Sequence, residues 1–75
     1  MPATTIKPRD ALRQELRAAL RQYLEQRGGT AAGAEAVRHV ALEENVDPSH
    51  VAAAMWTLVD EGIAEYGRNA ELTLA

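Results

Sequence analysis

The chain contains no cysteine and no phenylalanine, and its only aromatic residues are one tryptophan and two tyrosines. Without cysteine it can form neither a disulfide framework nor a zinc site with thiolate ligands. Without phenylalanine the core depends on aliphatic side chains, and much of the apolar content is alanine. We therefore expect a small core that consists of Leu12, Leu16, Leu20, Leu24, Val37, Val40, Val51, Met55, Leu58 and Ile63.

Long apolar runs are also missing. No uninterrupted apolar segment approaches the roughly 18 residues that a membrane span needs, and the polar start MPATTIKPRD does not resemble a signal peptide. We expect a soluble, cytoplasmic protein without a membrane partner. The 75 residues allow one domain. A domain of this size buries only about 60% of its unfolded surface, so a partner or a second copy can matter for its stability.

Side chains suited to catalysis are scarce. His39 and His50 are the only imidazoles, and a metal site would require carboxylates such as Glu43 beside them. Ser49 and His50 are neighbours in a predicted helix, where their side chains diverge by about 100° and cannot form a nucleophile–base pair. We expect no catalytic residue, no metal site and no cofactor, and therefore no enzyme.

The net charge of −3 is unevenly distributed. Residues 1–38 carry seven lysines and arginines against four carboxylates, whereas residues 39–75 carry one arginine against seven carboxylates. The C-terminal half is therefore acidic, which weighs against a nucleic acid partner for that half of the chain.

The strongest local pattern is the segment DPSHVAAAMWTLVDEGIAEY. Asp47 is suited to cap a helix, because its carboxylate can accept free amide hydrogens of the first turn. Pro48 suits the first helical position, and an apolar stripe with spacings of four and three follows it. Gly62 is a natural stop for a helix over 48–61. Strand-type residues on both sides of the turn GRNA then predict a β-hairpin over 63–74.

A first helix is predicted from about Pro8 to Gln26, since leucine recurs at every fourth position from 12 to 24. Arg13, Arg17 and Arg21 form a basic stripe beside the leucines. This stripe is either a solvated flank, partly paired with Glu25, or a contact strip for phosphate or an acidic partner.

Between these helices we expect a loop and one further helix. Glycines at 28, 29 and 33 bracket the residues TAA as a loop, which lacks the GK[ST] sequence of a phosphate-binding loop. A second helix follows over about 34–44, and Asn45 is suited to end it in a left-handed conformation. Two short helices joined by a tight turn form a helix-turn-helix.

The residues VRHVALEENVDPSHVAAAMWTLVDEGIAEY, followed by a short hairpin, resemble the winged helix-turn-helix domain common in bacterial regulators. The resemblance covers residues 30–74, with the first helix as the third helix of the bundle, and implies a mainly α fold of three helices with a small β-hairpin. We expect one domain over residues 8–75, preceded by a flexible N-terminus of residues 1–7. Glu44 departs from the pattern, which usually has a leucine there. Either the second helix is rotated so that Leu42 contributes more to the core, or that end of the core is thin.

The resemblance also implies binding of double-stranded DNA and a role in transcription regulation, with the helix 48–61 in a major groove and the hairpin as the wing. The residues that would then meet DNA are Ser49, His50, Ala53, Thr57, Arg68, Asn69, Arg13 and Arg17. The outward face of this helix has no Arg, Lys, Asn or Gln, the residues that usually read bases, and Asp60 and Glu61 repel phosphate.

An alternative function follows from Trp56. The indole either packs against the first helix or the wing, or is partly exposed beside Ala52 and Ala53. In the second case it forms an apolar patch with an aromatic anchor, which is typical of protein interfaces. The same fold would then serve as a protein-interaction or homodimerisation module with little affinity for DNA.

Overall fold

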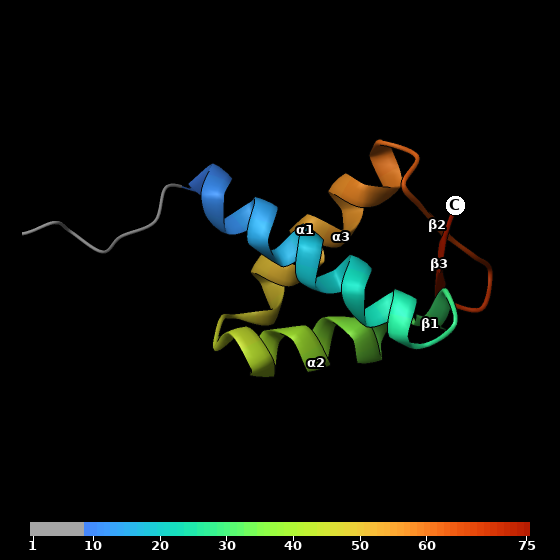
Figure 1. The fold of residues 1–75 in the computed structure, drawn as a ribbon, viewed down its shortest axis with the longest axis horizontal. Coiled ribbons are helices and arrows are strands. Elements are labelled where there is room, and N and C mark those ends of the chain that lie inside the picture. Colours follow the sequence, from blue (N-terminus) through green and yellow to red (C-terminus); the bar gives the residue numbers. More distant parts are fainter. Residues whose placement is uncertain (1–8) are drawn as a thin grey trace, which may run out of the picture.

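The computed structural model describes residues 9–75, so the predicted flexible segment 1–7 lies outside the described residues. The helices are α1 (Arg9–Gln26), α2 (Gly33–Glu44) and α3 (Pro48–Asp60), and the strands are β1 (Thr30–Ala32), β2 (Ala64–Tyr66) and β3 (Glu71–Leu74). In Figure 1, α1 crosses in front of α3, α2 runs below them, and the sheet lies beside the C-terminal end of α1. The mainly helical architecture with a small antiparallel sheet is confirmed.

The sheet has one strand more than the predicted hairpin. Residues 30–32, which we expected to form a loop, are β1, and they pair antiparallel with β3 in the order β1-β3-β2. Gly28 and Gly29 have φ angles of +81° and +97°, which redirect the chain immediately after α1. The hydroxyls of Thr30 and Thr73 then meet at 2.9 Å across the strand pair. Three residues are too few to show the alternating pattern of a strand, so this segment is a strand because it pairs with β3.

All three helices end in the same way. In each case a residue with positive φ follows the helix, and the next amide donates back to the carbonyl five residues earlier, as in the Schellman motif. These bonds are Gly29 to Leu24 at 2.7 Å, Val46 to Ala41 at 3.0 Å and Ile63 to Leu58 at 3.0 Å. The predicted stops at Asn45 and Gly62 are confirmed, although α3 ends at Asp60 rather than at residue 61 and α2 begins at Gly33 rather than at residue 34.

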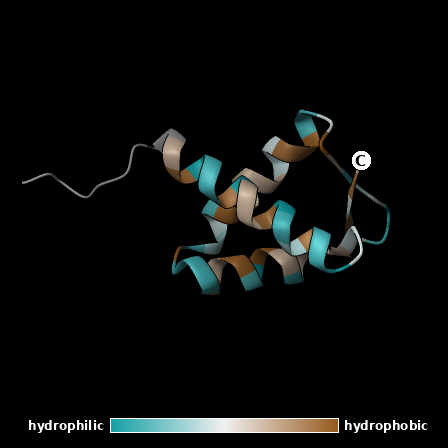
Figure 2. Ribbon diagram, in the orientation of Figure 1, coloured by the Kyte–Doolittle hydropathy of each residue, from teal (hydrophilic) through white to brown (hydrophobic). Residues whose placement is uncertain are grey.

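The core lies between the three helices and the inner face of the sheet. Figure 2 shows hydrophobic and hydrophilic segments alternating along each helix, as amphipathic helices require. Most predicted core residues are buried, while Leu12, Val37 and Ile63 are only partly buried. The structure adds the buried residues Tyr23, Ala36, Ala41, Ala54, Ala64 and Leu72. No helix within residues 9–75 has the combined length and hydrophobicity needed to cross a bilayer.

The C-terminal end of α2 is thinly packed. Leu42 is 76% exposed, so the expectation that a rotated second helix turns this leucine into the core is wrong. Val40 and Ala41 are buried instead, and one further step of about 100° takes the next side chain off that face. Glu44 is exposed at the helix end, consistent with the other alternative.

Candidate functional site

The outward face of α3 is the surface that the sequence singled out. Burial of Val51, Ala54, Met55 and Leu58 fixes the rotation of this helix. The opposite side consequently presents the exposed residues Ser49, Ala53, Trp56 and Asp60.

Asp47 anchors the start of this helix. Its carboxylate accepts a hydrogen bond of 2.9 Å from the backbone N–H of Ser49. Hydrogen bonds from the backbone and side chain of Ser49 lower the pKa of the Asp47 carboxyl, and the nearby His50 acts in the same direction. The predicted cap is confirmed, and this carboxylate is committed to the helix.

An aromatic pair forms one border of the α3 face. The rings of Trp56 and Tyr66 lie 4.9 Å apart between centroids at an interplanar angle of 61°, an edge-to-face contact. Trp56 is nevertheless 46% exposed and Tyr66 41% exposed. The indole thus packs against the hairpin and is also partly exposed, so each of the two predictions for Trp56 is confirmed in part. We refer to Trp56 and Tyr66 as the aromatic pair.

The ring of Tyr66 lies directly against Gly33. A β-carbon at position 33 would lie 2.9 Å from Cε1 of Tyr66 and 3.3 Å from the carbonyl oxygen of Ala70. Only a glycine therefore lets the hairpin lie so close to the start of α2. The N–H of Gly33 also donates to that carbonyl at 2.8 Å. The hairpin is fixed to α2 at this point, and through Tyr66 it supports Trp56.

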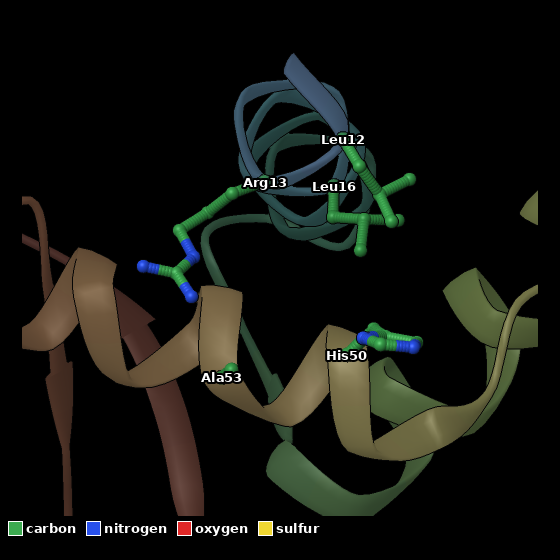
Figure 3. Close-up of a pocket in the computed structure, with 5 residues that line it drawn as sticks. All are labelled: Leu12, Arg13, Leu16, His50 and Ala53. Atoms are coloured by element: carbon green, nitrogen blue, oxygen red, sulfur yellow. The ribbon is translucent and has the colours of Figure 1, made fainter. Parts of the chain in front are cut away.

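The basic stripe of α1 runs along the other border of α3. Arg13 lines an open pocket together with Leu12 and Leu16 of α1 and His50 and Ala53 of α3. Figure 3 shows the guanidinium of Arg13 extending from α1 toward α3, and His50 lying below the two leucines. Three of the predicted nucleic-acid residues, Arg13, His50 and Ala53, therefore lie together.

Arg17 and Thr57 make internal contacts instead. The guanidinium of Arg17 pairs with the carboxylate of Glu61, the residue that caps the C-terminal end of α3, and its side chain is only 16% exposed. Its Nε is buried without a hydrogen-bond partner. The hydroxyl of Thr57 donates to the carbonyl of Ala53 at 2.9 Å. Both groups therefore have partners within the chain. Farther along the stripe, Arg21 lies 3.9 Å from Glu25, so the predicted pairing is confirmed.

The hairpin turn is exposed and carries Arg68 and Asn69. Around it the charge is negative, because residues 47–75 contain Arg68 as their one lysine or arginine against five carboxylates. Ala70 closes the turn with a φ of +59°, an unfavourable conformation for a residue with a β-carbon.

Sequence reasoning missed the contribution of Tyr66 and Gly33 to this surface. The sequence predicts Tyr66 as a strand residue and Gly33 as a loop residue, but their contact joins segments that are distant in the chain.

A scan against protein-family models found no match, and searches of the curated proteins and of the solved structures found none either.

Proposed function

We propose that the chain is a winged helix whose α3–wing surface binds another protein. Two features support the fold assignment. The elements follow the order helix, strand, helix, helix, strand, strand, and the central strand of the sheet is the last one in the chain. The β2–β3 hairpin beside α3 is then the wing.

The observation that carries the functional proposal is the exposure of the aromatic pair. A tryptophan and a tyrosine that are both more than 40% exposed, and fixed against each other, provide a rigid apolar anchor beside Ala52 and Ala53. Tryptophan and tyrosine are enriched among the residues that dominate protein interfaces. The acidic surroundings support a protein partner, since phosphate neutralisation supplies most non-specific affinity for DNA.

Site-specific photocrosslinking in the cell of origin tests this proposal. A photoreactive amino acid at Ala53 is expected to give discrete protein adducts, whereas the same group at Thr30, exposed on the outer face of the sheet, gives none. Trp56→Ala should abolish the adducts at position 53. Because this side chain is half-exposed, the variant is expected to retain a cooperative thermal transition, which circular dichroism checks. Adducts unaffected by Trp56→Ala, or the absence of adducts at position 53, would contradict the proposal.

Binding of double-stranded DNA is the second candidate. It is favoured by the position of Arg13 beside His50 and Ala53, because this places a cation along α3, and by Arg68 at the tip of the wing. Ser49 and Asn69 would supply neutral hydrogen bonds. The few cations imply weak binding that depends on salt with a logarithmic slope of about −2 to −3.

Fluorescence anisotropy with a generic duplex at low salt tests this second candidate. Arg13→Ala and Arg68→Ala should each weaken binding, whereas Arg38→Ala on α2 removes the same charge elsewhere and serves as the control. Absence of binding at low salt, or equal losses for all three variants, would exclude a DNA site at α3 and the wing.

A further inference from the structure

A second exposed apolar feature lies on the α1–α2 side of the molecule. Leu42 is 76% exposed and shares an outward stripe of α2 with Glu35 and Arg38, at spacings of three and four residues. The proposed function makes no use of this leucine. An isolated exposed leucine would be unremarkable, so its surroundings decide its importance.

Leu42 lies at the edge of a surface depression between α1 and α2. The depression is lined by Tyr23, Arg27, Glu35, Arg38, His39 and Leu42, and we call it the leucine depression. The buried Tyr23 makes two ring contacts in this depression. The centroids of the Tyr23 and His39 rings lie 4.8 Å apart, and the guanidinium of Arg27 lies 4.8 Å from the centroid of the Tyr23 ring. The exposed side chain of Leu42 thus borders a depression that also contains the ring of Tyr23.

The two apolar surfaces differ in shape and in charge. The leucine depression is shallow, is lined by α1, α2 and the turn residue Arg27 after α1, and has two arginines against one glutamate in its lining. The aromatic pair projects from α3 and β2, and the exposed carboxylate of Asp60 lies one helical turn after Trp56 on the same face of α3. Opposite charges favour contact between unlike surfaces, and like charges disfavour contact between two aromatic pairs.

We propose that the partner of the aromatic pair is a second copy of this chain, which receives it in the leucine depression. This inference rests on the proposed function, because it names the protein that the α3–wing surface binds. One chain carries both complementary surfaces, and they share no residue. The contact joins two unlike surfaces, so the rotation between successive copies sets whether assembly closes into a ring, the smallest being a dimer, or continues as an open chain.

Sedimentation velocity of the full chain at low salt, over a wide range of concentrations, tests the inference. The average mass of the wild-type protein is expected to rise with concentration to that of a dimer or beyond, and to fall toward the monomer when salt is added. Leu42→Asp blocks the leucine depression and Trp56→Ala removes the projecting ring, so each variant alone should remain monomeric. Ala34→Asp, at an exposed site of α2 outside the depression, should associate like the wild type.

The decisive sample is an equimolar mixture of the Leu42→Asp and Trp56→Ala proteins. Each retains one intact surface, so the mixture should form a dimer and nothing larger. A wild-type protein that stays monomeric throughout, or a dimer that survives Leu42→Asp, would overturn the inference. Neither result removes the proposed function, which fails if position 53 gives no adducts or if the adducts persist in Trp56→Ala. Circular dichroism confirms that the variants are folded before they are mixed.

Discussion

Substitution of Gly33 by alanine tests how closely the β2–β3 hairpin is fixed to the helices. The β-carbon of the new residue would lie 2.9 Å from the ring of Tyr66, closer than two carbon atoms normally approach, and 3.3 Å from the carbonyl oxygen of Ala70. The clash does not arise from the backbone at position 33, where the structure has no positive φ. Any loss of stability therefore reports the contact with the hairpin.

The expected loss follows from two opposing effects. Overpacking of this kind typically costs about 1–3 kcal/mol. Alanine is favoured over glycine by up to about 1 kcal/mol inside a helix, but position 33 is the first residue of α2 and gains only part of that. We expect Gly33→Ala to lower the free energy of unfolding by about 1 kcal/mol, which lowers Tm by about 4–8 °C in a domain of this size.

A double-mutant cycle with Tyr66→Ala isolates the steric effect. Removal of the ring leaves space for the β-carbon, so Gly33→Ala in the Tyr66→Ala background should change stability by less than about 0.5 kcal/mol. Urea unfolding followed by circular dichroism measures all four proteins. Fluorescence of Trp56 serves as a second probe, because the indole contacts the tyrosine ring.

Two results would refute this reasoning. One is a higher Tm for Gly33→Ala than for the wild type, which would mean that the hairpin accommodates the methyl group without cost. The other is an equal loss of stability with and without the tyrosine ring, which would place the effect elsewhere than in this contact.

Three further predictions concern stability. Ala70→Gly should raise the free energy of unfolding by about 0.5 kcal/mol, because it relieves a left-handed alanine; thermal unfolding checks this, and an unchanged or lower Tm would contradict it. Glu61→Gln should destabilise the protein by about 0.5 kcal/mol, because the loss of the charged partner of Arg17 outweighs the removal of a carboxylate from the negative end of α3; the effect should shrink at high salt and disappear in an Arg17→Met background. The folded pKa of Asp47 is lowered, so its contribution to stability is present above about pH 4 and is lost as the pH falls through the folded pKa; the Tm values of wild type and Asp47→Asn, measured against pH, should converge only in that acidic range.

The candidate surface was only partly predictable. The outward position of Ser49, Ala53 and Asp60 followed from helical periodicity once the buried stripe was known, and the structure agrees. The role of the arginine stripe could not be predicted from the sequence. Periodicity placed Arg13 and Arg17 beside the leucines of α1, but whether each is exposed or paired depends on how α3 crosses that helix.

The sequence by itself determined the helices, their ends and the position of the hairpin. Those features depend on residues within about five positions of each other, such as the carboxylate of Asp47 at the start of α3 and Gly62 after its end. Only the tertiary structure decided that residues 30–32 form a strand, that Arg17 pairs with Glu61 and that Trp56 meets Tyr66. The hydroxyls of Thr30 and Thr73 come from positions 43 residues apart, and the Arg17–Glu61 contact joins positions 44 apart. Contacts of that kind depend on the packing of whole elements, which no local pattern encodes.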